Sequence, residues 1–240
     1  LNGPAYAIDV EGNDFYASGL FTKAGGNSSA DGMAHWNASA WNAMGSFSGI
    51  AFDIEANGSG VYAGGDFDVN PGITDFGIWN GSSWSTLGPG IASDNGILDI
   101  EIQGSDIYVA GDFCEVGGNF NIRGIAHWDG SSWNALGTGC FCWGSVGGRA
   151  IGIKNSDVYV GGWFSSAGGV PNTANLGRWD GSAWNAVGIP NLIPASSQVL
   201  AIEISANDVY VGGWFSGIGG VPNTGYIARW GEPLPPCTPC

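Results

Sequence analysis

The chain has few charged residues and very few basic ones. Only 11% of its 240 residues are charged, and 6 lysines and arginines stand against 21 aspartates and glutamates, which gives a formal net charge of −15. Nucleic-acid binding needs a basic surface that neutralises phosphates, and a polybasic membrane anchor needs clustered lysines and arginines. This charge balance excludes both classes. So few charged side chains also argue against long solvated helices.

Long apolar runs and catalytic motifs are missing as well. No segment approaches the roughly 18 to 20 apolar residues that span a bilayer, so we predict no membrane insertion. The sequence contains no G-x-S-x-G elbow, H-E-x-x-H helix, P-loop or dinucleotide fingerprint. It has only two histidines, His35 and His127. We therefore predict that the protein is not an enzyme and needs no resident cofactor.

The chain begins at Leu1 without a methionine or an apolar leader, so we expect a processed product. An odd number of cysteines in an acidic chain rich in glycine, asparagine and serine predicts an oxidising compartment, with one or two disulfides and a leftover thiol. Cys114 with Cys140 or Cys142 and Cys237 with Cys240 are the candidate pairs, and the connectivity stays open. Their spacing suits no standard zinc site.

Four N-x-S/T sequons are candidate glycosylation sites. They begin at Asn27, Asn37, Asn57 and Asn80.

Glycine and tryptophan are abundant, with 44 and 12 residues, and both recur with a period. One tyrosine returns at intervals of about 46 to 51 residues, at Tyr16, Tyr62, Tyr108, Tyr159 and Tyr210, and a tryptophan follows it each time, at Trp36, Trp79, Trp128, Trp179 and Trp230. We divide the chain into repeats at about 1–50, 51–96, 97–148, 149–198 and 199–230, with a Pro/Cys-rich tail or linker at 231–240. Such a period is typical of repeat architectures.

Each repeat contains four short apolar runs. The first alternates with a period of two, as in residues 97–102, the second holds the tyrosine, and the third and fourth each hold a tryptophan. Asn80-Gly81, Asp129-Gly130 and Asp180-Gly181 separate the last two runs and supply tight hairpin turns. Four antiparallel strands in about 47 residues are typical of a β-propeller blade. We predict an all-β propeller of about five four-stranded blades, with the last one incomplete.

The segment 161–188, GGWFSSAGGVPNTANLGRWDGSAWNAVG, resembles repeats of secreted bacterial β-propeller proteins and is also similar to the fungal cortical polarity-marker family. The resemblance implies a propeller fold and an extracellular setting, and it carries no catalytic residues. Two arrangements stay open: a ring closed by five blades, which we favour, or part of a larger ring or stack.

Acidic residues recur on the predicted innermost strands. The tyrosine alignment places Asp9, Glu55, Glu101 and Glu203 at one position, and Asp53 and Asp99 two positions earlier. Two explanations stay open. The acids could ring a channel and bind a cation, or each could accept hydrogen bonds from the neighbouring blade, which is the favoured explanation. Asp66, Asp68 and Asp75 are a separate candidate site for calcium, although their spacing matches no EF-hand loop.

The residue between glycine and phenylalanine of the tyrosine run varies among the repeats, which is unusual for a core position. In the last two repeats it is Trp163 and Trp214. These two indoles could stack on a sugar ring, with Asn172 and Asn223 as polar partners, and Trp143 is a separate candidate contact. Packing between blades is the alternative that we favour for Trp163 and Trp214.

Together these features predict a secreted or cell-surface module for adhesion or extracellular assembly, whose partners are other protein subunits or surface glycans. A lectin-like propeller is the alternative, and a propeller hydrolase or oxidase is the least favoured. Equivalent repeat positions put His35 and His127 just before the first tryptophan, where we expect packing or hydrogen bonding.

Overall fold

The computed structural model describes residues 1–69, 72–91, 93, 96–137, 147–188, 197–206, 208–215 and 225–230. Within these residues the protein is built of β-strands and connecting turns, without helices, so no helix there is long and apolar enough to cross a membrane. The strands form five antiparallel sheets, four of them four-stranded and one three-stranded. The predicted all-β class is confirmed.

Each sheet consists of strands that follow one another along the chain. The first sheet contains β1 (Ala5–Glu11), β2 (Asp14–Gly19), β3 (Met33–Trp36) and β4 (Trp41–Ala43). The second contains β5 (Phe47–Ala56), β6 (Val61–Val69), β7 (Ile73–Trp79) and β8 (Trp84–Ser85). The third contains β9 (Ile97–Gln103), β10 (Asp106–Gly111), β11 (Ile125–Trp128) and β12 (Trp133–Asn134).

The fourth sheet contains β13 (Gly148–Lys154), β14 (Asp157–Gly162), β15 (Leu176–Trp179) and β16 (Trp184–Ala186). The fifth contains β17 (Gln198–Ser205), β18 (Asp208–Trp214) and β19 (Ile227–Trp230). Every sheet therefore corresponds to one repeat, although β5, β13 and β17 each begin one to four residues before the repeat boundary expected from the sequence.

The hairpin turns form where the sequence places them. Gly81, Gly130 and Gly181 have φ angles of 95°, 90° and 90°, which glycine adopts without the clash that a Cβ would cause. The preceding Asn or Asp side chain accepts backbone N–H groups two and three residues later; Asp129, for example, accepts those of Ser131 and Ser132. These bonds hold the turn that brings the two tryptophan strands together.

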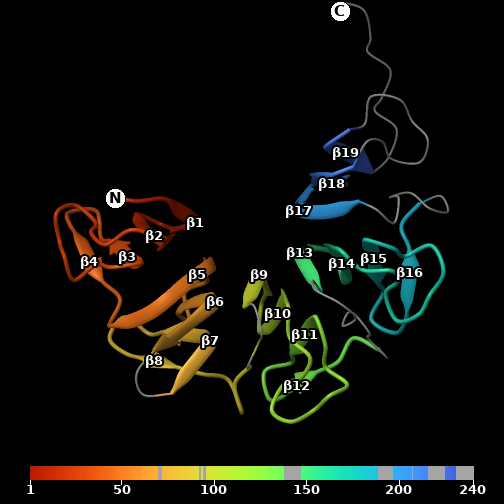
Figure 1. The fold of residues 1–240 in the computed structure, drawn as a ribbon, viewed down its shortest axis with the longest axis horizontal. Coiled ribbons are helices and arrows are strands. Elements are labelled where there is room, and N and C mark those ends of the chain that lie inside the picture. The colour runs from red at the N-terminus through yellow and green to blue at the C-terminus, as the bar shows by residue number, and fades with distance from the viewer. Residues whose placement is uncertain are drawn as a thin grey trace, which may run out of the picture.

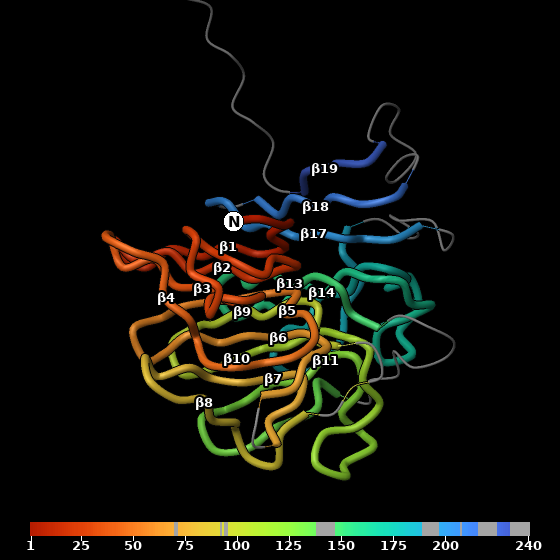
Figure 2. Tube along the Cα trace, turned by 60° about the vertical axis from the view of Figure 1, so that its left-hand side comes forward, coloured from red at the N-terminus to blue at the C-terminus, as the bar shows by residue number. Residues whose placement is uncertain are grey.

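The sheets follow one another around an arc with their first strands toward its centre (Figure 1). Neighbouring first strands are in contact, from β1 with β5 through to β13 with β17. The arc is open between β1 and β17 (Figure 1), and Figure 2 shows its stacked layers from another side. The expected closure of the sheets into a five-membered ring is therefore not seen among the described strands.

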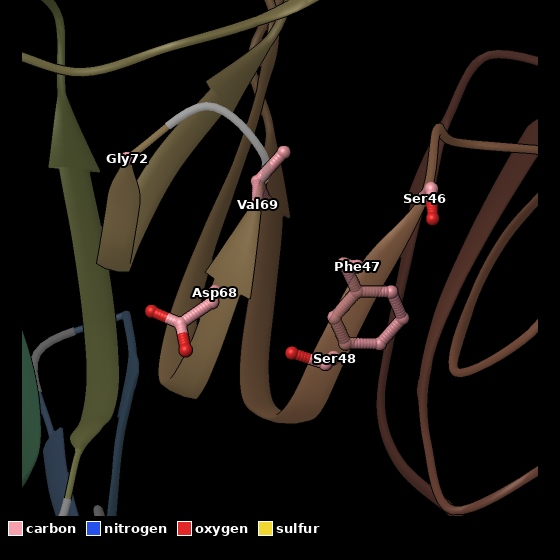
Figure 3. Close-up of a pocket in the computed structure, with 6 residues that line it drawn as sticks. All are labelled: Ser46, Phe47, Ser48, Asp68, Val69 and Gly72. Carbon is pink, nitrogen blue, oxygen red and sulfur yellow. The ribbon is translucent and has the colours of Figure 1, made fainter.

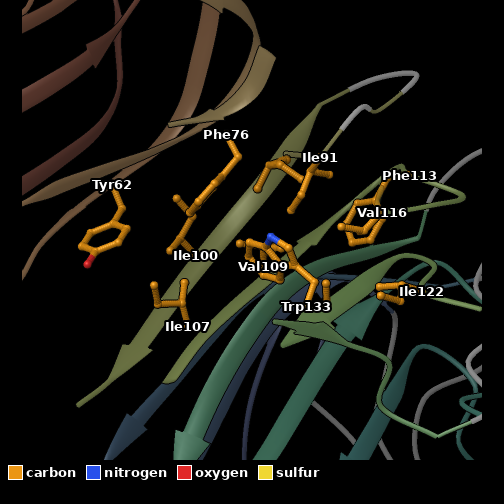
Figure 4. Packing of buried hydrophobic residues seen from close by; sticks show 12 residues of the cluster. Tyr62, Phe76, Ile91, Ile100, Ile107, Val109, Phe113, Val116, Ile122 and Trp133 are labelled. Atoms are coloured by element: carbon orange, nitrogen blue, oxygen red, sulfur yellow. The ribbon is translucent and has the colours of Figure 1, made fainter. Parts of the chain in front are cut away.

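The apolar core lies between consecutive sheets. Tyr62 and Phe76 of the second sheet pack against Ile100 and Val109 of the third, and Trp133 completes this cluster (Figure 4). Comparable clusters join the first sheet to the second, the third to the fourth, and the fourth to the fifth. An isolated sheet would leave such a face in water, so each sheet depends on its neighbours.

Gly64 of β6 and Gly161 of β14, in the strands that hold the repeat tyrosine, allow this close packing. A Cβ on Gly64 would meet Ile97 of the next sheet at 2.6 Å, and one on Gly161 would meet Val199 at 2.3 Å. A Cβ on Gly212, in the last sheet, would meet nothing closer than 3.8 Å. Gly64 and Gly161 therefore allow the following sheet to approach closely, whereas Gly212 has no such neighbour closer than 3.8 Å.

Candidate functional site

The carboxylates of the innermost strands hydrogen bond to the neighbouring sheet. Asp9 accepts the backbone N–H of Ala56 at 2.6 Å. Asp53 accepts that of Ile100 at 2.7 Å, and Asp99 that of Ile151 at 2.5 Å. These bonds agree with the explanation favoured from the sequence, in which each acid bonds the neighbouring repeat. Among the described residues no group of three or more metal-binding side chains is positioned to hold an ion.

Burial and mutual repulsion perturb these acids. Loss of water raises the pKa of Glu55 to about 8, and repulsion from Glu101 and Asp53 contributes. The pKa of Glu101 is raised to about 7 by burial and by Glu203 and Asp53. Burial also raises the pKa values of Asp53 and Asp99. One oxygen of Glu55, Oε2, is buried without a hydrogen-bond partner, which adds to the cost of ionising that side chain.

A second recurring contact lies farther out on the sheets. His35 bonds Asp14 at 2.8 Å and His127 bonds Asp106 at 2.5 Å, and each imidazole stacks on the repeat tyrosine. Arginines take the same place in the fourth and fifth sheets, where they pair with Asp157 and Asp208. The two histidines therefore fill a structural position, as the sequence predicts.

The two candidate sugar-stacking indoles are exposed. Trp163 is 42% exposed, Trp214 is 67% exposed, and they belong to different sheets. Their exposure runs against the inter-sheet packing that the sequence favoured for them. Asn172 lies in a turn with a φ angle of 63°. Asn223 and Trp143, the other candidates for this role, lie outside the described residues.

The three candidate calcium ligands differ in burial and in their contacts. Asp66 and Asp68 are exposed on β6, whereas Asp75 is buried on β7. Asp75 accepts the backbone N–H of Ser93 at 2.8 Å, and burial raises the pKa of its carboxyl group. Asp75 thus anchors the connection that leads to the third sheet.

Cys114 is a half-buried thiol, and it forms no disulfide within the described residues. The other four cysteines of the predicted pairs, Cys140, Cys142, Cys237 and Cys240, lie outside them.

The sequon asparagines differ in their surroundings. The Asn27 side-chain nitrogen, where a glycan would attach, donates to the Trp41 carbonyl at 3.1 Å. Asn37, Asn57 and Asn80 use their side-chain oxygens to close turns, accepting for example the Ser39, Ser59 and Ser82 backbone N–H groups. The side-chain nitrogen of Asn27 is therefore already engaged in a hydrogen bond within the protein.

Sequence reasoning missed a group of cavities around the connection from the first sheet to the second. A cavity of about 360 Å³ is lined by Ser46, Phe47, Ser48, Asp68, Val69 and Gly72 (Figure 3). A cavity of about 450 Å³ lies on the first-sheet side, between Phe47 and the turn at 28–31, and another of about 410 Å³ lies beside Trp79 and Trp84. Ser46 lines all three.

Residues of the extended β5–β6 hairpin line all three cavities. β5 has ten residues and β6 has nine, against six to eight for the corresponding strands elsewhere. Pairing continues from Ala51 opposite Gly65 to Phe47 opposite Val69. Apolar and polar residues alternate over only four positions in 47–50 and in 66–69, which is too short a pattern to predict this extension from the sequence.

The first and last sheets each expose one apolar face. Ile8 of β1 is 63% exposed, whereas the equivalent Ile54, Ile100 and Ile151 are 2–3% exposed. Val10 and Phe15 beside it are exposed too. At the other end Ile227 of β19 is 66% exposed, whereas the equivalent residues Met33, Phe76, Ile125 and Leu176 are at most 3% exposed. The first and last sheets lie on either side of the opening of the arc (Figure 1).

No family model matches the chain, and no curated protein matches it. Among solved structures it is similar to the computationally designed Ika8 protein, with a TM-score of 0.50 and 13% identity over 88% of this chain and 55% of that one. It is also similar to the extracellular domain of a putative one component system from B. thetaiotaomicron, with a TM-score of 0.50 and 9% identity over 87% of this chain and 25% of that one. The chain thus spans about half of the first protein and a quarter of the second, and these likenesses concern the fold alone.

Proposed function

We propose that the protein is a secreted or cell-surface β-propeller module that assembles with other copies of itself and has no catalytic role. Each sheet would be one blade. The extracellular setting is supported by one structural relative that is itself an extracellular domain and by the resemblance of the repeats to secreted propeller proteins. The observation that carries the proposal is the pair of exposed apolar faces on the first and last sheets.

These two faces are the two halves of one interface. Between the first and second sheets, Ile54 and Val61 pack against Tyr16 and Met33. The first sheet exposes Ile8 and Phe15, the equivalents of Ile54 and Val61, and the last sheet exposes Ile227, the equivalent of Met33. Large apolar patches on a protein surface mark interaction sites.

A second copy is the partner that these faces fit, because each copy carries both halves. The last sheet of one copy would then pack on the first sheet of the next, as consecutive sheets pack within the chain. Such head-to-tail contacts are heterologous, and they produce rings or open filaments according to the rotation between copies.

A mixing experiment tests the proposal. Ile8→Asp blocks the first face and Ile227→Asp blocks the last one. Because both side chains are exposed, each variant should fold and give a wild-type melting curve. We expect the wild type to show a mass that rises with concentration in light scattering, and each variant alone to stay monomeric. An equimolar mixture should form a dimer through the two unblocked faces. A wild type that stays monomeric at every concentration would refute self-assembly.

Glycan binding through exposed tryptophans is a second candidate function. Trp163 and Trp214 present exposed indoles at equivalent positions of the last two sheets, and an aromatic face is a suitable platform for a sugar ring.

A further inference from the structure

We propose that the cavities around Phe47, between the first and second sheets, form a binding groove for a neutral carbohydrate chain. This site is separate from the terminal faces and from Trp163 and Trp214, so it does not depend on the self-assembly proposed above. It is defined by residues 28–31 of the first sheet, the connection 43–48, and Asp68 of β6.

Phe47 supplies the aromatic surface of the groove. Its ring is half-buried, lies over Gly32 and meets Phe67 edge-on, with ring centroids 6.1 Å apart. A Cβ on Gly32 would stand 2.3 Å from the ring, so any larger residue at this position would clash with the ring. These contacts fix the orientation of the ring, and a fixed flat apolar surface is what the C–H face of a sugar packs against.

The polar groups around this ring are hydroxyls and carboxylates. Ser28, Ser29, Ser46 and Ser48 line the two cavities that contain Phe47, and the structure assigns none of these four hydroxyls a partner among the described residues. The serines of the hairpin turns differ, because the hydroxyls of Ser39, Ser82 and Ser131 bond the Asn or Asp side chain of their own turn. The groove serines are thus available to a ligand.

Charge selects the class of ligand. Asp31 and Asp68 line the groove, and no lysine, arginine or histidine does. In a chain with a net charge of −15, such a groove repels sulfated and carboxylated glycans. Carboxylates accept hydrogen bonds from sugar hydroxyls, serine hydroxyls both donate to them and accept from them, and the aromatic ring packs on the sugar face. A neutral oligosaccharide satisfies all three groups.

The repeat supports the placement of this site. Ser29 aligns with Asn172, because Tyr16 and Tyr159 are equivalent. The groove therefore uses the same loop of the repeat in which the sequence indicated a sugar contact, but in a different sheet. In repeat proteins, departures from the common unit gather on the binding face, and the long β5–β6 hairpin is such a departure.

The test uses the whole chain and a panel of immobilised neutral oligosaccharides, namely β-glucan, chitin, mannan and galactan fragments, with heparin fragments as the anionic comparison. The best neutral probe is then titrated calorimetrically against the variants. Phe47→Leu keeps an apolar side chain but removes the flat ring, and Asp68→Asn removes one groove charge. Asp66→Asn is the matched control, because Asp66 is also an exposed carboxylate of β6 but lies outside the groove.

We expect the wild type to bind a neutral oligosaccharide and not heparin. Phe47→Leu should weaken binding at least about tenfold with an unchanged melting temperature, Asp68→Asn should weaken it several-fold, and Asp66→Asn should leave it unchanged. Failure of the wild type to bind any neutral probe would overturn the proposal. So would equal affinity of the wild type and Phe47→Leu, or a loss of binding confined to Trp163→Ala and Trp214→Ala. If Phe47→Leu lowers the melting temperature, the proposal is judged on the affinities of Asp68→Asn and Asp66→Asn alone, and equal affinities would overturn it.

Discussion

Asp53, on the innermost strand of the second sheet, accepts the backbone N–H of Ile100, on the innermost strand of the third sheet, at 2.7 Å. Asp99 makes the equivalent bond to the Ile151 backbone N–H of the fourth sheet at 2.5 Å. Burial raises the pKa of both carboxyl groups, and repulsion from Asp53 raises that of Asp99 further. The centre of the arc therefore retains protons that exposed carboxyl groups would release.

This arrangement predicts that stability falls as the pH rises. The pKa of Glu55 is raised from 4.5 to about 8 and that of Glu101 to about 7. Between pH 4.5 and 8 the folded state therefore binds more protons than the unfolded state, so the free energy of unfolding decreases with pH. The stabilisation should be complete below about pH 4.5 and lost as the pH passes through 7 to 8. We expect the melting temperature to be about 5 °C lower at pH 9 than at pH 5.5.

Replacing one of these acids should remove part of that dependence. Glu55→Gln keeps the length of the side chain but carries no charge, so its melting temperature should exceed that of the wild type at pH 9. Glu115→Gln, away from the central acids, should follow the wild-type profile. Equal slopes of melting temperature against pH for the wild type and Glu55→Gln would contradict the assignment.

The glycines of the tyrosine strands predict an asymmetry between inner and terminal sheets. A Cβ on Gly161 would stand 2.3 Å from Val199, whereas the nearest atoms to one on Gly212 are 3.8 Å away, an ordinary contact distance. Gly161→Ala should therefore lower the free energy of unfolding by about 2 kcal/mol through overpacking. Gly212→Ala, the same substitution at the equivalent position, should change it by less than about 0.5 kcal/mol. Urea unfolding of the two variants measures the difference, and similar losses in both would show that packing against the next sheet is not the cause.

The second tryptophan of each repeat predicts a similar contrast. The indole N–H of Trp184 donates to the Leu136 carbonyl of the preceding sheet at 2.7 Å, and Trp133 and Trp84 make the equivalent bonds to Leu87 and Met44. Trp184→Phe leaves that buried carbonyl without its donor and should cost about 2 kcal/mol. Trp41→Phe, in the first sheet, should cost less, because its indole N–H has no equivalent carbonyl partner among the described residues. Chemical denaturation monitored by far-ultraviolet circular dichroism reports both values.

The exposed indoles give a prediction for the second candidate function. If Trp163 and Trp214 bind glycans, Trp163→Ala and Trp214→Ala should each reduce binding to a glycan array at least about tenfold. The melting temperature should stay unchanged, because both side chains are exposed. A fall in melting temperature would instead assign them to packing. Unchanged binding with unchanged melting would remove them as sugar contacts.

Much of the fold follows from the repeat itself. The tyrosine and tryptophan positions predict where each strand lies, and the Asp-Gly and Asn-Gly pairs predict the turns, because both signals act over a few residues. The extended β5–β6 hairpin could not be predicted, since it pairs Phe47 with Val69, and these residues are far apart in the sequence and show no distinctive local pattern. The groove that this hairpin forms was missed for the same reason.

The sequence alone determined that this protein is an acidic all-β chain of repeated antiparallel sheets, because alternation, turn residues and period are local properties. Only the tertiary structure decided which repeated positions are covered. Ile8 and Ile54 occupy the same place in their repeats, yet one is exposed and the other buried, because only the second has a preceding sheet in the structure. Burial, raised pKa values and unpartnered faces arise from the neighbours that a sheet has, and an identical local sequence has the same preference whether or not those neighbours are present.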